Sequence, residues 1–489
     1  MKKSIWLLCL ALILNIFLSC GENFAQEEGP HVLNPKAPEI SDSKENAAEK
    51  KGEGGQKDSE LEEKDEPSDE DVIIPVNEPS CDDESAKWTL LVYMAADNNL
   101  EGAAIADFNE LENAEFDDDV NVLVLFDRSE NYDATNGDWS DTRLYRISRD
   151  DRLNRSQIVS EQLDCPELGL SVGGRTELDM ANPFTLSGFC EFSKKNFPAE
   201  NYALIIWGHG TGWRGESEKS AVQPDVTRAV AIDDSSSSYM AISQLRSALS
   251  DGMKEKFSVI GFDTCFGMTL ECAYELSECA DYMLGTPALV PESGWNYTEL
   301  MNGFARSEKT CGDFIDCVMS QYEKSFSDYG YASFVCVDLC KIPAFVRAFS
   351  DYAKNLASAI RTKDMHDEVF GIFEKECVSY CSTSYPTDFY VDVRDLLLKL
   401  SAYCPGGEVL SILSQSVVKD WSASGAESSF GVFFGVYRSP GVLQSSHPQN
   451  YRKGSRDTNL SRFVRDCDGY VPTEENSGSL LDKLFYTNY

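Results

Sequence analysis

Residues 202–210 of the chain read Tyr-Ala-Leu-Ile-Ile-Trp-Gly-His-Gly, an apolar run that ends on His209 between two glycines. Residues 257–265 read Phe-Ser-Val-Ile-Gly-Phe-Asp-Thr-Cys, a second such run that ends on Asp263 and Cys265. Short apolar runs bounded by turn residues are typical of strands that are buried on both faces. We therefore predict two buried strands, each with a reactive side chain at its carboxyl end.

Other segments extend this pattern into a sheet. Residues 88–93 predict another buried strand, and a polar turn at 95–99 leads from it into a helix over Leu100–Phe116. Strands that alternate with helices indicate an α/β fold with a mostly parallel central sheet and helices on both faces. Sites in such sheets form beyond the carboxyl ends of the strands, where His209 and Cys265 lie. Further expected elements are strands at Val120–Phe126 and Ser333–Val337, an apolar stretch at Phe430–Tyr437, and helices at Gly267–Cys279, Gly312–Ser327, Pro343–Arg361 and Val391–Tyr403.

The beginning of the chain has the pattern of a secretory signal. Two lysines precede an apolar run over Ile5–Leu18, which is shorter than the roughly 20 residues that a membrane-spanning helix needs. Phe17–Cys20 resembles a bacterial lipobox, in which cleavage before the cysteine leaves a lipid-modified end. We expect a signal peptide over residues 1–20, lipidation at Cys20 and a lipid-anchored protein of the bacterial cell envelope. A plain signal peptide that is cut elsewhere, followed by secretion, is the alternative.

The formal net charge of the 489 residues is −39. Such an acidic chain does not supply a phosphate-neutralising surface, which excludes nucleic acid as a partner. Residues 21–86 contain 21 Asp or Glu and six Lys, with no Trp or Tyr. This composition is typical of a disordered segment that is extended by self-repulsion. We therefore predict an acidic tether between the lipid and the folded part, with a solvated linker of no other purpose as the alternative.

His209 and Cys265 are the residue types of a thiol nucleophile and its base. A cysteine attacks as the thiolate and needs an imidazole, a helix N-terminus or both to lose its proton. The helix expected from Phe266 or Gly267 would favour the anion. The amides of Gly210 and Cys265 would bind the oxyanion of the reaction intermediate. A surface histidine and an unrelated buried cysteine are the alternative interpretation.

Local sequence supports the catalytic interpretation. Ile205–Trp213 and Gly261–Met268 closely resemble the two signatures of the clostripain family of cysteine peptidases. The resemblance extends from Trp88 to Val464, which is most of the folded chain. Further matching segments are Leu90–Leu100, Ala231–Ser235, Pro291–Trp295 and Phe389–Asp392.

The resemblance implies a caspase-like fold and an endopeptidase that often cleaves after Arg or Lys. His209 would be the general base and Cys265 the nucleophile of a dyad without a required third member. Asp263 matches the position that lines the primary specificity pocket, where it would pair with a basic side chain. A helix cap is the alternative role for this Asp. We place the peptidase domain at residues 87–404, with a C-terminal extension packed on it over residues 405–489.

Three features depart from the family pattern. Relatives tend to carry acidic residues just before a Pro-Gly-x-Gly-Trp segment, whereas Pro287–Val290 is uncharged here and Glu292 stands in place of the first glycine. A pocket for a neutral side chain is therefore an alternative to one for Arg or Lys. Thr264 replaces a common Ala, which is a change small enough to leave Cys265 in place.

Activation and cofactors also follow from the resemblance. Members are commonly activated by cleavage between the His and the Cys, so self-cleavage after Lys219 or Arg214 is an expectation. We expect no required cofactor, although several members respond to calcium. Asp233 and Asp234 supply suitable oxygens without a recognisable ligand spacing, so an exposed acidic turn is the preferred interpretation.

Fourteen of the 16 cysteines remain when Cys9 of the signal and the lipidated Cys20 are set aside. Disulfides Cys311–Cys317 and Cys377–Cys381 are candidates, although the pairing cannot be deduced from spacing. The four histidines do not fall at zinc-ligand spacing with cysteine pairs.

Other classes of function are open at this level. One alternative is a membrane-tethered binding lipoprotein that retains the peptidase-like fold without the activity. Another is an amidase, in which the same Cys–His pair acts on another acyl group.

Overall fold

The computed structural model describes residues 85–115, 117–152, 156–212, 230–372, 376–380 and 390–433. Its centre is a nine-stranded sheet in the order β13-β10-β9-β8-β5-β1-β2-β3-β4. The five strands β2, β1, β5, β8 and β9 are mutually parallel, and antiparallel strands complete both edges. The bounds are β1 Ala86–Ala96, β2 Val120–Arg128, β3 Thr142–Arg146, β4 Glu161–Leu163, β5 Ala199–Trp207, β8 Phe257–Asp263, β9 Ala280–Gly285, β10 Ser333–Asp338 and β13 Val417–Ser422.

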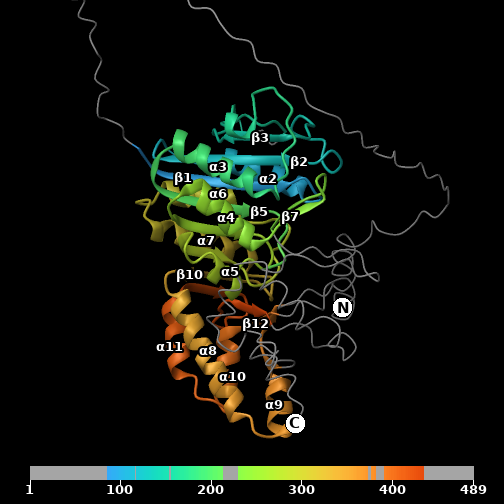
Figure 1. Cartoon of the computed structure of the whole chain (residues 1–489). Helices are drawn as coiled ribbons and strands as arrows, with labels where there is room; N and C mark the ends of the chain where they lie inside the picture. Colours follow the sequence, from blue (N-terminus) through green and yellow to red (C-terminus); the bar gives the residue numbers. More distant parts are fainter. Residues whose placement is uncertain are drawn as a thin grey trace, which may run out of the picture. The chain divides into compact units, whose positions relative to one another are not determined.

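Helices cover both faces of this sheet (Figure 1). Along β1, Leu91, Tyr93 and Ala95 belong to one hydrophobic core, whereas the alternate residues Leu90 and Val92 belong to the other. Successive side chains of a strand point to opposite faces, so both faces of β1 are buried. One core holds residues of α3 Pro183–Asn196, α4 Ile242–Met253, α5 Leu270–Glu275 and α8 Ile342–Ala359, and the other those of α2 Glu101–Glu112, α6 Tyr297–Ala305 and α7 Cys311–Phe326.

The predicted α/β class is confirmed. The expected strands correspond to β1, β2, β5, β8 and β10, and the longer expected helices to α2, α7, α8 and α10 Val393–Leu400. Sequence analysis did not identify the central strand β9 or the edge strands β3, β4 and β13, because polar residues interrupt the apolar run in each of them. Remaining elements are a 3-10 turn at Pro166–Leu168, α9 Lys363–Gly371, α11 Gly407–Ser416, a sheet of β11 Ser379–Tyr380, β12 Tyr390–Asp392 and β14 Gly431–Phe433, and a hairpin of β6 Val230–Asp233 and β7 Ser238–Met240.

The segment predicted to be a packed C-terminal extension contributes to the sheet itself. β13 pairs in antiparallel fashion with β10 and forms the edge of the nine-stranded sheet. β14 pairs with β12, which lies before the predicted boundary at residue 404. The described residues after Pro79 belong to a single compact unit.

The candidate disulfide Cys311–Cys317 is not formed, because both thiols are free. The two residues lie six positions apart in α7, which separates them by about 9 Å along the helix axis. A disulfide requires Cα atoms about 4.4–6.8 Å apart. The other candidate pair includes Cys381, which lies outside the described residues. Within the described ranges, no helix combines the length and apolar character needed to cross a membrane.

Candidate active site

Three strand ends bring the predicted reactive residues to one edge of the sheet. β5 pairs in parallel with β8, and Trp207 lies opposite Asp263. His209 lies two residues after Trp207, and Cys265 lies two residues after Asp263. Both residues therefore follow neighbouring strands at the same level. β1 lies on the other side of β5 and brings its polar turn, residues 97–99, to the same edge.

The imidazole of His209 contacts a side chain from the turn after β1. Its Nε2 lies 2.8 Å from Asn99 Oδ1. With that oxygen as the acceptor, Nε2 carries the proton and Nδ1 is the nitrogen that can accept one. Desolvation by burial lowers the pKa of His209 to about 4, so the ring is neutral at pH 7. A neutral imidazole is the form that a general base requires.

The turn that carries Asn99 is held in place by its neighbour Asn98. Asn98 Nδ2 donates to the carbonyl of Ala95 over 3.1 Å and to that of Ile232 over 2.9 Å. The second contact joins the turn to β6. Sequence analysis included this turn among the family-like segments but missed Asn99 as the partner of His209, because the register of β1 against β5 creates the contact.

Cys265 is partly buried, and its sulfur lies beside the loop that follows β9. The amide of Val290 donates to Cys265 Sγ over 3.3 Å. Phe266 has a left-handed backbone conformation, with φ 55°, and its amide donates to the carbonyl of Ala288 over 2.8 Å. The loop after β9 therefore contacts both the sulfur and the backbone that follows Cys265.

The helix expected to begin at Phe266 or Gly267 begins at Leu270, with Thr269 as its N-cap. The residues between hydrogen bond to the loop after β9 and do not form a first helical turn. α5 therefore starts well beyond Cys265, and a helix dipole acts only within about one turn. The predicted start of this helix is wrong, and its stabilisation of the thiolate stays a prediction.

Gly210 packs against the nucleophile loop with no room for a side chain. An ideal Cβ at this position would lie 2.5 Å from the carbonyl oxygen of Cys265 and 2.6 Å from Thr264 Cβ. Gly210 also forms an antiparallel bridge with Val230. This close approach of two backbones explains the glycine sterically. The oxyanion role of the Gly210 and Cys265 amides stays a prediction.

Asp263 is buried beside Cys265 and does not cap α5. Its Oδ2 accepts hydrogen bonds from the amide of Trp295 and from Tyr297 Oη, each over 3.0 Å. Its Oδ1 is buried and has no hydrogen-bond partner in the described part of the chain. An unpartnered buried carboxylate oxygen is costly, so it marks a place where a donor is missing.

A second buried carboxylate, Asp107 of α2, lies next to Asp263. Asp107 Oδ2 accepts from Trp207 Nε1 over 2.7 Å. An ideal Cβ on Gly294 would lie 2.9 Å from Asp107 Oδ2 and 3.0 Å from Asp263 Oδ2, so both carboxylates border this glycine. Burial raises the pKa of both carboxyls, to about 7 for Asp263, and the charge of Asp263 raises that of Asp107 further.

Sequence analysis missed Asp107. The available signal was an acidic residue on the buried face of α2, next to Phe108 and between the turns that carry Ala104 and Leu111. Charged residues are rarely buried without a partner, so such a position indicates a site.

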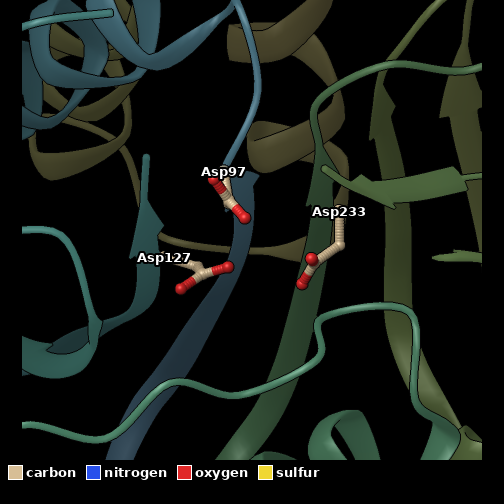
Figure 2. Close-up of side chains that lie close together, drawn as sticks. All are labelled: Asp97, Asp127 and Asp233. Carbon is tan, nitrogen blue, oxygen red and sulfur yellow. The ribbon is translucent and has the colours of Figure 1, made fainter. Parts of the chain in front are cut away.

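Asp233 and Asp234 do not share one environment. Asp234 is exposed, whereas Asp233 is buried, so the exposed-turn interpretation is wrong for Asp233. The carboxylate of Asp233 lies with those of Asp97 and Asp127, and one oxygen of each lies within 4.8 Å of the others (Figure 2). Among the described residues, the carboxylates of Asp97, Asp127 and Asp233 lie close enough together to bind one metal ion.

Several predicted sites fall outside the described residues. They are the lipidation site Cys20, the tether up to residue 84, and the cleavage sites Arg214 and Lys219.

Comparison with known proteins connects these residues to a family. The model of the clostripain family matches residues 92–420. Clostripain from Hathewaya histolytica is 30% identical over 244 residues, which cover 47% of this chain and 44% of that protein. The chain thus spans less than half of the length of this relative.

Two solved structures share the fold. A secreted C11 cysteine protease from Bacteroides thetaiotaomicron, in complex with an irreversible peptide inhibitor, has a TM-score of 0.55 and 18% identity, covering 78% of this chain and 99% of that one. An inactive zymogen C11 protease from Parabacteroides distasonis has the same score, identity and coverage of this chain, and 98% of it is matched.

Proposed function

This chain belongs to the clostripain family, and on that premise we propose that it is a cysteine endopeptidase that hydrolyses peptide bonds through His209 and Cys265. The observation that carries the proposal is the parallel register of β5 and β8, which ends both strands at one level. Gly210, beside His209, packs directly against the carbonyl of Cys265. Nucleophile and base therefore share one edge of a rigid sheet.

The proposed reaction begins with proton transfer from Cys265 Sγ to Nδ1 of His209. Asn99 Oδ1, 2.8 Å from Nε2, orients the ring and keeps the other proton in place. The thiolate attacks the carbonyl carbon of the peptide, and backbone amides, including those of Gly210 and Cys265, stabilise the oxyanion. The imidazolium then donates its proton to the leaving amine, which leaves a thioester on Cys265. Water activated by His209 hydrolyses the thioester and restores the thiol.

We propose that the substrate side chain before the cleaved bond is Arg or Lys. Asp263 Oδ1 is buried without a described partner, and Asp107 places a second carboxylate beside it. A guanidinium or ammonium group would satisfy that oxygen and offset the repulsion between the two acids. Segment 287–290 has no acidic residue. Asp107 of α2 would thus supply the acidic side chain in its place.

Hydrolysis of a library of internally quenched peptides by the full chain tests the activity. We expect cleavage after Arg or Lys, blocked by an irreversible thiol-directed peptide inhibitor that labels Cys265. Cleavage after neutral residues alone would reject the basic pocket and keep the dyad. A chain that neither cleaves peptides nor reacts with the inhibitor would instead be a tethered binding lipoprotein, and one that cleaves only non-peptide amides would be an amidase.

We also propose that the protein is exported, anchored by a lipid on Cys20 and held away from the membrane by residues 21–86, and that it cuts itself after Arg214 or Lys219. Both cleavage sites match the proposed preference for basic residues. Mass spectrometry of protein purified from membranes tests these points. We expect a lipid-modified N-terminal Cys20. We also expect two fragments, produced by cleavage at a bond between His209 and Cys265. An unmodified N-terminus would reject the anchor, and intact chain in an active preparation would reject self-cleavage.

A further inference from the structure

We infer that Tyr390 of β12 is a positioning residue for the reaction, because its side chain joins the loop that carries His209 to the loop that carries Cys265. The residue lies on the small sheet of β11, β12 and β14, far from both loops in the sequence. Its side chain is buried, with an exposed fraction of 1%. This role rests on the proposed peptidase function and adds a residue from outside the segments that carry the dyad.

The hydroxyl of Tyr390 contacts the chain just after His209. Tyr390 Oη donates to the carbonyl of Thr211 over 3.2 Å. Gly212 passes so close to this hydroxyl that an ideal Cβ there would lie 2.1 Å from Oη, and its φ of 85° is in the left-handed region. Glycine permits both the close approach and this backbone conformation. The base is therefore held through its ring, by Asn99, and through the backbone that follows it, by Tyr390.

The ring of Tyr390 packs on the residue that follows the nucleophile. Its centroid lies 5.5 Å from that of Phe266, with 26° between the two ring planes. Phe266 has a φ of 55°, a conformation that is costly for a residue with a Cβ and persists where its surroundings impose it. Here the stacked ring and the hydrogen bond from Phe266 N to the carbonyl of Ala288 impose it. Because Phe266 adjoins Cys265, a change in this backbone angle would move the thiol.

The small sheet that carries Tyr390 is itself hydrogen-bonded to the nucleophile loop. In β14, the amide of Gly431 donates to the carbonyl of Met268 over 3.1 Å, and Gly431 forms a parallel bridge with Thr269. β14 pairs in antiparallel fashion with β12. An ideal Cβ on Gly431 would lie 3.2 Å from Tyr390 Cβ, so the two strands pack closely at this point. Backbone hydrogen bonds and close packing therefore fix the tyrosine, as a positioning residue requires.

The connection between the two loops matters because the rate depends steeply on the alignment of base and nucleophile. A displacement of about 1 Å can lower a rate about 10²-fold. Gly210 packs against the carbonyl of Cys265 without a side chain. Tyr390 adds a hydrogen bond to one loop and a stacked ring to the other. Loss of the hydroxyl should release the loop of the base alone, whereas loss of the ring should release both loops.

Steady-state hydrolysis of the best peptide of the library by full-length Tyr390→Phe and Tyr390→Leu tests this role. Tyr390→Phe keeps the ring and loses the hydrogen bond to Thr211, so kcat should fall about 3–10-fold, the typical effect of one hydrogen bond. Tyr390→Leu loses both contacts, and its kcat should fall about 10²-fold or more. KM should stay within about two-fold in both variants, because the buried Tyr390 contacts the catalytic loops and not the substrate.

Tyr352 of α8 provides the matched control. Its side chain is also buried, and its hydroxyl also donates to a backbone carbonyl, that of Cys404, over 3.3 Å. Tyr352→Phe should lower the Tm about as much as Tyr390→Phe and should leave kcat within about two-fold of the wild type. Similar Tm values with unequal kcat values separate a positioning role from a structural one. An equal loss of kcat in the two Phe variants would overturn the role of Tyr390.

Alkylation of Cys265 by iodoacetamide at pH 7, followed by mass spectrometry of the peptide that contains it, gives a test without hydrolysis. His209→Ala should slow this reaction at least about 10-fold, because the imidazole accepts the thiol proton. Tyr390→Leu should slow it nearly as much.

The outcomes distinguish the two proposals. Alkylation as fast in Tyr390→Leu as in the parent, beside slow alkylation in His209→Ala, would overturn the role of Tyr390 and leave the peptidase proposal intact. A parent as slow as His209→Ala would reject the dyad and, with it, any positioning of the dyad. If Tyr390→Leu does not fold, Tyr390→Phe serves in its place, and a kcat equal to that of the wild type would overturn the role.

Discussion

Replacement of Cys265 by alanine is expected to lower kcat/KM for peptide hydrolysis by at least about 10⁴-fold, because removal of a covalent nucleophile typically costs this much or more. Without Sγ no thioester forms, and His209 has only water to activate. The fold should persist, since the change removes one partly buried sulfur atom, whose contacts include the amide and the carbonyl of Val290 at 3.3 and 3.9 Å. Initial rates on the best peptide of the library measure the effect.

A second cysteine provides the control. Cys340 is exposed and its replacement by alanine should leave kcat/KM within about two-fold of the wild type. Circular dichroism and Tm of both variants establish that they fold. Activity of Cys265→Ala above a few per cent of the wild type would remove Cys265 from the role of nucleophile.

Replacement of Asp263 by asparagine is expected to lower kcat/KM for peptides with Arg or Lys before the cleaved bond by about 10²–10³-fold. Breaking a buried charge pair typically costs about 3–5 kcal/mol. Asparagine has nearly the same shape, so the contacts with Trp295 and Tyr297 can be kept. Peptides with a neutral side chain at that position should change little. An equal loss for basic and neutral peptides would instead assign Asp263 a purely structural role.

The carboxyl of Asp263 should also control the pH dependence of peptide hydrolysis. Burial raises the pKa of Asp263 to about 7, so below this pH the group is protonated and lacks the charge that a basic side chain needs. We expect kcat/KM for Lys and Arg peptides to increase as the pH rises through about 7, and Asp263→Asn to remove this increase. The pKa of His209, near 4, lies too low to produce it.

The stability of the parent chain should decrease as the pH rises, whereas kcat/KM should increase. A carboxyl whose pKa is higher in the folded than in the unfolded state contributes stability below the unfolded pKa, and that contribution is lost as pH rises through the folded pKa. For Asp263 this window runs from about 4 to about 7. Asp263→Asn should therefore unfold at a higher temperature than the parent above pH 7. Thermal scans from pH 4 to pH 8 measure this, and a parent Tm that is flat across the window would contradict the shifted pKa.

Much of the architecture was predictable because it depends on local sequence. The runs that became β1, β5 and β8 are apolar except at Thr89 and Ser258, and a strand buried on both faces is apolar at nearly every position. The parallel sheet then placed His209 and Cys265 at one edge, since the carboxyl ends of parallel strands meet there. The two family-like motifs contain both residues, so the candidate dyad needed no tertiary information.

The parts that failed were those in which distant segments compete with local preference. Phe266 and the residues after it looked helical, but their backbone hydrogen bonds go to the loop after β9, so α5 starts only at Leu270. Asp233 looked exposed because acidic turns usually are. Its burial depends on Asp97 and on Met180, which lies 53 positions away in the chain.

The sequence by itself therefore determined the α/β class, the buried strands and the two candidate reactive side chains. Only the tertiary structure decided what surrounds them: Asn99 on the imidazole, Asp107 beside Asp263, and three aspartates from separate strands around one point. The physical reason is register. Periodicity and turn residues report what each segment becomes, whereas the alignment of one strand against another depends on packing over both faces of the sheet, which no single segment encodes.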